Sequence, residues 1–259
     1  MTDGPLAGCR VLVTRPATQA GALCHAIEAA GGEAIRFPVI RISPQAPQAV
    51  AGALGRLPDA DIVIFVSRNA ADLGLPFVQD GGAAIAAVGP ATAAAIEARG
   101  VRVDIIPDGG FDSEHLLGHP ALRSVEEKSI LIVRGESGRE LLREELEARG
   151  ALVNYLPVYR RELNKLSPEC IAAVDRDWQA GRIDCVTVMS VGTFENLVAQ
   201  LPPTSLEQLR QTPLVAPGER VIQTACDQMP GIRAILAPGP RADDMVNALQ
   251  AWWHCGQKS

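Results

Sequence analysis

Small hydroxyl residues, glycines and a few arginines follow the expected strands of this sequence at seven places. Where a parallel strand ends and the next helix begins, backbone N–H groups point outward, so these positions suit an anion. The candidate binding residues of this kind are Thr14, Arg15, Ser67, Asn69, Gly89, Thr92, Ser113, Arg134, Gly135, Ser190, Gly218 and Arg220. They predict an anionic ligand held by amides and hydroxyls, without a dense cationic pocket.

Helix capping is the alternative role of these residues. Ser, Thr and Asn routinely cap helix N-termini, and each cap stabilises its helix by about 1 kcal/mol. At any single position capping explains the residue at least as well as a ligand does. Only the repetition of the pattern along the chain favours a binding site.

Tyr159 is the candidate for proton transfer. It follows Pro157 at the end of an extended segment, and its phenol can donate or accept a hydrogen bond. Packing against a neighbouring segment is the alternative for this side chain. Tyr155, two residues before Pro157, is expected to belong to the core instead.

Other familiar catalytic patterns are absent from the sequence. There is no GxGxxG or GxxxxGK[ST] loop for a nucleotide and no GxSxG elbow for a hydrolase. His115 and His119 are four residues apart, but the glutamate of a metalloprotease helix is missing. The six cysteines form no CxxC pair, so buried thiols are expected in place of disulfides or zinc. We therefore expect no metal and no nucleotide loop, and a reaction driven by the substrate with the protein supplying the geometry.

Composition excludes two classes of partner. The chain has 259 residues, a net charge of −6 and only 4% aromatic residues, whereas nucleic-acid binding needs clustered cations and stacking platforms. Its apolar runs are far shorter than the roughly 18 residues that span a membrane. Its start shows no signal-peptide pattern. The expectation is a cytoplasmic monomer that binds neither nucleic acid nor membrane.

An alternating pattern of segments must position the candidate residues. Short β-branched runs alternate with Ala-, Leu- and Glu-rich stretches, which is typical of parallel strands joined by helices. Ten strands are expected, at residues 11–14, 34–37, 62–66, 85–88, 101–106, 130–133, 152–156, 185–189, 214–216 and 234–236. The predicted fold class is therefore α/β.

The sequence also repeats itself. A shift of 119 residues brings Arg15 onto Arg134 and Pro38 onto Pro157. Further along, DIVIFVS matches DCVTVMS, and AVGPATAAAIEARGV matches VAPGERVIQTACDQM. Because the matches keep their order, they predict two copies of one five-stranded unit. Ligands prefer the junction between such domains.

Taken together, these segments resemble the uroporphyrinogen-III synthase family over essentially the whole chain. The segments that carry the resemblance are VLVTRP, DIVIFVSRNA, AAVGPATAAAIEARG, GGFDSEHLL, ILIVRGESGRELLREELEARG and LPVYRREL. The resemblance implies two flavodoxin-like parallel-sheet domains, joined by a two-stranded linker, with a cleft between them. One domain would hold residues 1–37 and 163–259 and the other 43–156, with linkers at 38–42 and 157–162.

The same resemblance implies an activity that needs no cofactor. The family cyclises hydroxymethylbilane, a linear tetrapyrrole bearing eight carboxylates, to uroporphyrinogen III, with inversion of ring D and loss of water. Tyr159 matches the family's cleft tyrosine, which would assist departure of the hydroxyl group. The hydroxyl positions of the family that line the cleft are matched by Ser67, Thr92 and Ser190. The glycines whose following amides face substrate carboxylates are matched by Gly89 and Gly218. Arg15 and Arg134 would pair with carboxylates.

The second copy departs from the family pattern at one place. It reads Gly218-Glu219-Arg220-Val221 where relatives often have Gly-Pro-x-Thr, so Arg220 is expected to replace the missing hydroxyl only weakly. A non-catalytic two-domain protein that binds a small anion, such as a sensor, is the alternative from another class. A transferase acting on a phosphorylated metabolite is disfavoured because no phosphate loop is present.

Overall fold

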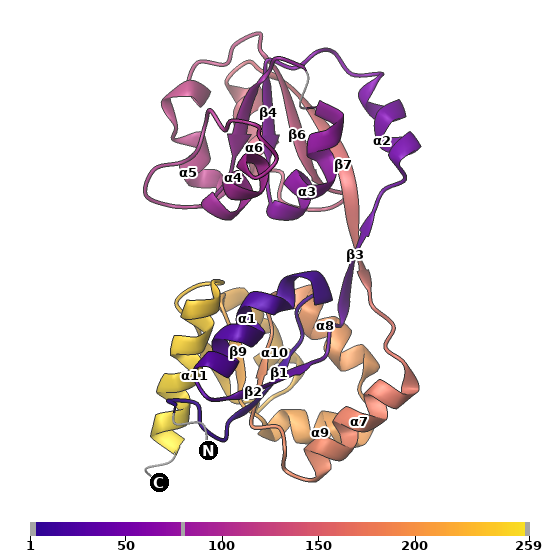
Figure 1. Ribbon diagram of the computed structural model, residues 1–259, viewed down its shortest axis with the longest axis vertical. Helices are drawn as coiled ribbons and strands as arrows, with labels where there is room; N and C mark the ends of the chain where they lie inside the picture. The colour runs from indigo at the N-terminus through magenta and orange to yellow at the C-terminus, as the bar shows by residue number, and fades with distance from the viewer. Residues whose placement is uncertain (1–3, 79–80, 257–259) are drawn as a thin grey trace. The chain divides into compact units, whose positions relative to one another are not determined.

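The chain divides into two compact units in the computed structural model, which describes residues 4–78 and 81–256. The first unit comprises Met1–Arg41 with Glu162–Ser259, and the second comprises Ile42–Arg161. Each unit is built around a five-stranded sheet (Figure 1). Among the described helices, none combines the length and the apolar character that crossing a membrane requires.

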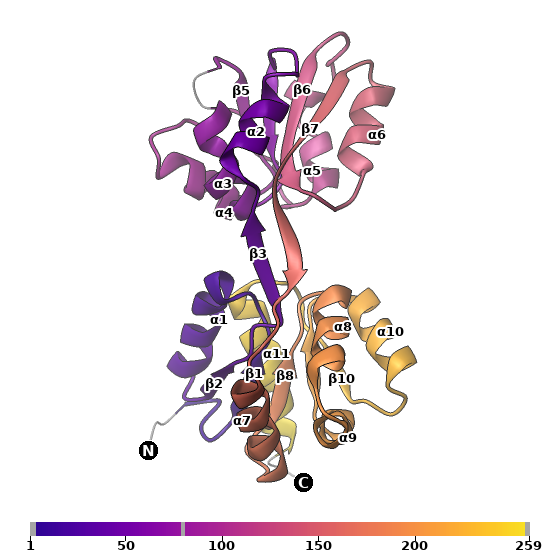
Figure 2. The ribbon, with the colours of Figure 1, turned by 90° about the vertical axis from the view of Figure 1, so that its right-hand side faces the viewer.

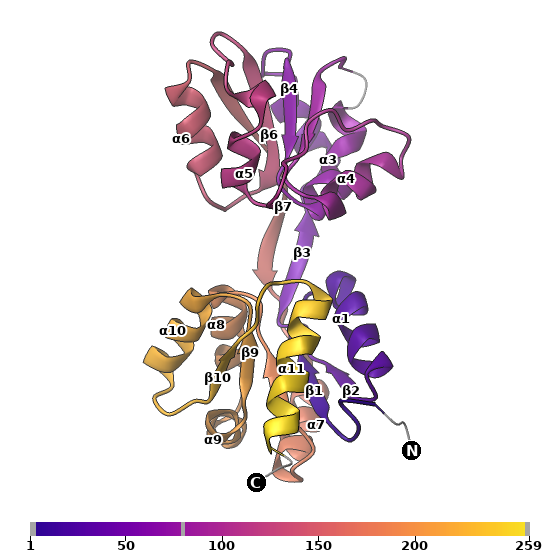
Figure 3. The same ribbon diagram turned by 90° about the vertical axis from the view of Figure 1, so that its left-hand side faces the viewer.

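The first unit is a parallel sheet covered by helices. Its strands are β1 (Arg10–Val13), β2 (Glu33–Arg36), β8 (Cys185–Thr187), β9 (Leu214–Ala216) and β10 (Ala234–Leu236). Its helices are α1 (Ala17–Ala29), α7 (Pro168–Gln179), α8 (Val191–Gln200), α9 (Pro203–Gln211), α10 (Glu219–Gln228) and α11 (Ala242–Gly256). The strand order is β10-β9-β8-β1-β2. Figure 3 shows α1 and α11 side by side, and their apolar faces share a core with β1.

The second unit has the same layered construction. Its strands are β3 (Ile40–Pro44), β4 (Ile62–Phe65), β5 (Ala84–Ala87), β6 (Ser129–Gly135) and β7 (Leu152–Leu163). Its helices are α2 (Pro47–Leu54), α3 (Arg68–Val78), α4 (Pro90–Glu97), α5 (Ser113–Leu117), the 3₁₀ turn η1 (Pro120–Leu122) and α6 (Leu141–Ala148). The strand order is β3-β7-β6-β4-β5. The chain passes from one unit to the other within β3 and again within β7. These two strands are hydrogen-bonded neighbours in the sheet.

Helices cover both faces of the second sheet, which explains its uninterrupted apolar strands. Val63 and Phe65 of β4 pack with α3 and α4, whereas Ile62 and Ile64 pack with α5 and α6. Figure 2 shows α2, α3 and α4 on one side of the sheet and α5 and α6 on the other. A strand buried on both faces needs apolar residues at every position, so the run IVIF is the expected sequence.

The two sheets share one strand order when the duplication is taken into account. The repeat pairs β1 with β6, β2 with β7, β8 with β4, and β9 with β5. The first sheet reads β2-β1-β8-β9-β10. The second reads β7-β6-β4-β5 and then a parallel bridge between Ala86 and Ile105. This is the flavodoxin-like order, so the predicted fold class is confirmed.

Two segments differ from the predicted strands. Residues 101–106 were expected to form a strand, but only Ile105 pairs there, as an isolated bridge. The Asp104 carboxylate accepts a hydrogen bond from the Ile85 N–H at 3.0 Å, so a side chain replaces a backbone partner of the ladder. Strand β3 was not among the ten strands expected from the pattern, but it overlaps residues 38–42, where the resemblance implied one of the two linker strands. It forms at the sheet edge beside β7, where proline is tolerated.

Gly74 lies in α3 against the sheet. A Cβ atom there would come within 2.4 Å of Val133 Cγ1. Such overpacking costs about 1–3 kcal/mol, which outweighs the roughly 1 kcal/mol that alanine gains over glycine in a helix. We expect Gly74→Ala to lower the thermal midpoint. Gly52→Ala in α2, where the nearest atom is 4.0 Å away, should raise it slightly. Thermal unfolding followed by circular dichroism tests this pair, and equal midpoints would contradict it.

Candidate functional site

A pocket of about 270 Å³ lies in the second unit at the carboxyl ends of β4 and β6. Five predicted site residues line it, namely Ser67, Ser113, Arg134, Gly135 and Tyr159. They come from the turn after β4, the start of α5, the end of β6, and β7. Ligands of parallel α/β sheets bind at this edge. The fold therefore brings together residues that are up to 92 positions apart in the sequence.

Tyr159 and Ser67 share a hydrogen bond in this pocket. Their oxygen atoms are 3.2 Å apart. Tyr159 is only 3% exposed, so its ring is fixed by the surrounding core. The Ser67 hydroxyl also accepts a hydrogen bond from the Ala70 N–H at 3.2 Å, and so caps the start of α3. Capping and contact with the pocket are thus combined in one residue.

Gly135 provides the space that the Tyr159 ring occupies. A Cβ atom at position 135 would lie 2.8 Å from Cε2 and 2.9 Å from Cζ of that ring. The Glu136 N–H donates to the Tyr159 carbonyl at 2.8 Å, which holds the end of β6 against β7. Any larger residue at position 135 would force the ring or the strand to move.

Arg134 is a buried cation next to this pair, with 5% of its surface exposed. Its Nη1 donates to Glu140 Oε1 at 3.0 Å, and its guanidinium carbon lies 4.3 Å from the centroid of the Tyr155 ring. The Tyr155 hydroxyl donates to Glu140 Oε2 at 2.7 Å. Burial, followed by the bond to Glu140, raises the pKa of Tyr155 to about 12. This phenol therefore keeps its proton at neutral pH and acts as a donor.

The packing of the two tyrosines is the reverse of the expectation. Tyr159 belongs to the core, whereas Tyr155 is half-buried. A bulge is the reason, because Pro157 pairs with Arg134 and Tyr159 pairs with the next residue, Gly135. Val158 is therefore an extra residue in β7. It turns Tyr159 to the face opposite Tyr155.

Several residues that line this pocket were not predicted from the sequence, namely Ser137, Gly138, Arg139, Tyr155 and Arg161. With Arg134 they place three arginines on its walls, although a site without a dense cationic pocket was expected. Arg134 is paired with Glu140, and Arg139 with Glu114. The run RGESGRE, which starts in the last two residues of β6, carries the signal that could have predicted this charge.

Three other predicted residues of the second unit lie outside this pocket. Gly89 precedes α4 in an extended conformation, and no side chain caps that helix. Thr92 is 6% exposed within the same helix. Asn69 is half-buried in the first turn of α3. Pro90 has no N–H and the Thr92 N–H donates to the Gly89 carbonyl at 3.0 Å, so the Ala91 N–H is what the start of α4 offers to an anion.

The predicted hydroxyls of the first unit are engaged within that unit. Thr14 is fully buried, and its hydroxyl donates to the Thr187 carbonyl at 2.6 Å. Ser190 caps α8, because its Oγ accepts from the Thr193 N–H at 3.2 Å and lies 2.8 Å from Thr193 Oγ1. Ser190 thus has the capping role that was its alternative, whereas the Thr14 hydroxyl caps no helix and links the end of β1 to β8.

The remaining candidates of the first unit are the charged and glycine positions. Arg15 donates through Nη2 to the Pro240 carbonyl, and its buried Nε has no partner within the described part of the chain. Burial lowers the pKa of Arg15. Gly218 precedes α10, which has no side-chain cap, and Arg220 is exposed in the first turn of that helix. Arg15 and the start of α10 therefore keep hydrogen-bonding capacity for a ligand.

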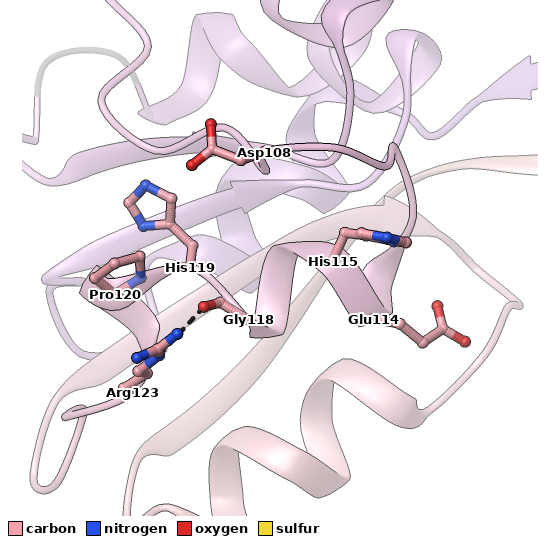
Figure 4. A pocket seen from close by; sticks show the side chains of 7 residues that line it. All are labelled: Asp108, Glu114, His115, Gly118, His119, Pro120 and Arg123. Atoms are coloured by element: carbon pink, nitrogen blue, oxygen red, sulfur yellow. Dashed lines mark hydrogen bonds between the residues drawn. The ribbon is translucent and has the colours of Figure 1, made fainter.

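A larger hollow of about 500 Å³ lies around α5 and η1 (Figure 4). His115 is hydrogen-bonded to Asp112 at 2.6 Å, and Arg123 donates to the Gly118 carbonyl at 3.2 Å. The imidazoles of His115 and His119 point in different directions. In the described ranges no group of three or more His, Cys, Asp or Glu side chains is arranged to hold a metal ion.

All five cysteines with described side chains are free thiols, and the sixth, Cys255, lies outside that set. Cys9, Cys24 and Cys185 are buried, and burial raises the pKa of the Cys9 thiol to about 12. The reactive species is the thiolate. Buried thiols of high pKa are therefore inert in the folded protein.

Alkylation of the native protein with a maleimide at neutral pH should modify Cys170 and Cys226, which are partly exposed. Cys9, Cys24 and Cys185 should react only after unfolding in urea, because burial both shields them and disfavours their thiolates. Peptide mass spectrometry reads out each position. Rapid labelling of Cys9 in the native protein would show that this core is not closed as described.

Comparisons with known proteins agree with this architecture. A family model described as uroporphyrinogen-III synthase HemD matches residues 21–247. Uroporphyrinogen-III synthase of Escherichia coli is 31% identical over 209 residues, covering 74% of this chain and 80% of the relative. The Synechococcus elongatus enzyme of the same name is 26% identical, covering 97% and 98%.

Solved structures support the fold. Uroporphyrinogen-III synthetase from Helicobacter pylori aligns with a TM-score of 0.63 at 15% identity, covering 94% of this chain and 99% of that one. A mutant uroporphyrinogen III synthase from Thermus thermophilus aligns with a TM-score of 0.58 at 19% identity, covering 97% and 100%. The family model spans most of the chain, and the Escherichia coli relative is matched over most of its length. The chain therefore belongs to the uroporphyrinogen-III synthase family.

Proposed function

We propose that this protein is a uroporphyrinogen-III synthase that closes hydroxymethylbilane to uroporphyrinogen III, with inversion of ring D and loss of water. Family membership supports the activity. The observation that carries the assignment of the site is the hydrogen-bonded pair Tyr159–Ser67 beside the buried Arg134, within one pocket. A proton donor and a carboxylate-binding cation are the two groups that this substrate requires.

Tyr159 is the proposed proton donor to the departing hydroxyl of the substrate. Ser67 accepts from the Ala70 N–H, so its own proton can go to the Tyr159 oxygen. The phenol proton of Tyr159 is then free to face the pocket. When the C–O bond of the hydroxymethyl group breaks, electrons from the pyrrole nitrogen fill the vacated position and the hydroxyl takes the phenol proton to leave as water. In this scheme Ser67 is a positioning residue.

Carboxylates of the substrate are the proposed ligands of the cationic and uncapped positions. In the second unit these are Arg134 and the start of α4 after Gly89. In the first unit they are Arg15 and the start of α10 after Gly218. Unpaired N–H groups at a helix start, together with the helix dipole, favour an anion. An octacarboxylate has enough groups to engage several of these positions, and we expect it to bind to a single chain.

Without an enzyme, hydroxymethylbilane closes without inversion of ring D and gives isomer I. Catalysis here therefore means holding the reacting ends of the substrate in the geometry that leads to isomer III. Incubation of the purified protein with enzymatically generated hydroxymethylbilane, followed by oxidation and separation of the isomers, tests the proposal. We expect isomer III to form well above the blank. Isomer I alone, at the rate of the blank, would leave the protein as a non-catalytic anion-binding protein.

A further inference from the structure

A carboxylate of the protein itself, that of Glu140, is bonded to two residues that line the pocket, Arg134 and Tyr155. Both carboxylate oxygens of Glu140 accept a hydrogen bond. Oε1 accepts from Arg134 Nη1 at 3.0 Å, and Oε2 accepts from the Tyr155 hydroxyl at 2.7 Å. The hydrogen bond from Tyr155, and then the one from Arg134, lower the pKa of Glu140. The group is therefore an ionised carboxylate held by two donors, which is the geometry that a substrate acetate or propionate would require.

The two sides of this ion pair differ in how firmly they are held. The Arg134 side chain is 7% exposed, and the Glu140 side chain is 49% exposed. The guanidinium lies against the Tyr155 ring, and a Cβ atom at Gly138 would be 2.8 Å from its Nη2, so the cation is enclosed. Glu140 is the residue that directly precedes α6, and about half of its side chain remains accessible to solvent while its two oxygens bond to Arg134 and Tyr155. The cation is thus fixed, whereas the anion can swing away.

We propose that Glu140 is an internal placeholder, which fills the Arg134–Tyr155 subsite in the free protein and is displaced there by a carboxylate of the substrate. The identity of that carboxylate rests on the proposed function. The exchange replaces one anion by another, so the charge balance of the buried arginine is kept before and after binding. An unpaired buried arginine would be costly, which explains why the free protein carries a substitute.

The exchange also gives the subsite selectivity. A neutral group could not replace Glu140, because it would leave the Arg134 charge without a counter-ion. Competition from Glu140 lowers the apparent affinity, since only the fraction of molecules with the subsite open can bind. Weakening the placeholder should therefore tighten binding, an effect opposite to that of removing an ordinary binding residue.

Glu140→Gln tests this exchange because it removes the charge and retains the size. We expect KM for hydroxymethylbilane to fall by about three- to tenfold, as the open fraction rises, with kcat changed less than twofold. The matched control is Glu145→Gln on the same helix, whose partner Arg149 lies 3.8 Å away and outside the pocket. The control should leave KM unchanged. A KM that is unchanged or higher in Glu140→Gln would overturn the proposal.

A second measurement does not depend on catalysis. Porphobilinogen, a monopyrrole with one acetate and one propionate group, is titrated into the wild-type protein while the side-chain carboxyl carbon of Glu140 is followed by NMR. The resonance should move toward that of a solvent-exposed glutamate as the probe saturates. A resonance that stays in place at saturation would refute displacement. Displacement without any isomer III would retain this inference and overturn the proposed function.

Discussion

Tyr159→Phe should lower kcat for isomer III about 10- to 100-fold, at or below the lower limit of roughly 100-fold for the typical contribution of a general acid. The substitution removes the hydroxyl that lies 3.2 Å from Ser67, and it keeps the ring that packs against Gly135. The pocket should keep its shape, so the remaining product should still be mainly isomer III. Steady-state rates and the ratio of the two isomers measure both parts of this prediction.

Two controls separate chemistry from folding in that experiment. The thermal midpoint of Tyr159→Phe should stay close to that of the wild type, because the buried ring is retained. Ser67→Ala should lower kcat by a smaller factor than Tyr159→Phe does, because the Ser67 hydroxyl only orients the phenol and caps α3. An unchanged rate for Tyr159→Phe would remove Tyr159 from the mechanism. A switch to isomer I would mean that the hydroxyl controls conformation and not proton transfer.

Gly135→Ala should be the more damaging change, although it adds a single methyl group outside the reacting atoms. The new Cβ would lie 2.8 Å from the Tyr159 ring, closer than packed carbon atoms allow, so the phenol must move. A displacement of about 1 Å at a catalytic group can cost roughly 100-fold in rate, and overpacking about 1–3 kcal/mol in stability. We expect kcat to fall at least about 100-fold, with a lower thermal midpoint.

The double variant Gly135→Ala/Tyr159→Phe shows whether the methyl group acts through the tyrosine. If it does, adding Gly135→Ala to Tyr159→Phe should lower kcat far less than it lowers kcat in the wild type, because coupled residues are not additive. Gly21→Ala in α1, where a Cβ meets no atom within 4 Å, is the control for an added methyl group and should leave activity unchanged. Additive losses in the double variant would assign the effect to general damage.

Most of the fold could be predicted from the sequence because the strands are buried on both faces. An apolar run rich in β-branched residues, such as Ile62–Phe65, is typical of a parallel strand that is covered on both faces. Residues 101–106 were wrongly predicted to form a strand, because their alternating Val and charged residues resemble one. The side chain of Asp104 takes a ladder partner there, which only the structure reveals.

The candidate site could be predicted in part. Ser67, Arg134 and Gly135 directly follow strand cores, so their place at the strand ends follows from topology. The contrast between Tyr155 and Tyr159 could not be predicted, because strict alternation puts residues four apart on one face. The bulge at Val158 breaks that alternation, and it depends on pairing between β6 and β7. The contact of Glu140 with Arg134 depends on the path of a loop, for which the sequence carries no periodic signal.

The central claim is that the pocket bounded by Tyr159 and Arg134 holds the substrate. A crystal structure of the protein with uroporphyrinogen III bound under reducing conditions tests it most directly. We predict a tetrapyrrole carboxylate within hydrogen-bonding distance of Arg134, Glu140 turned toward solvent, and the Tyr159 hydroxyl facing the macrocycle. A bound tetrapyrrole that leaves this pocket empty, with Glu140 still on Arg134, would contradict the assignment.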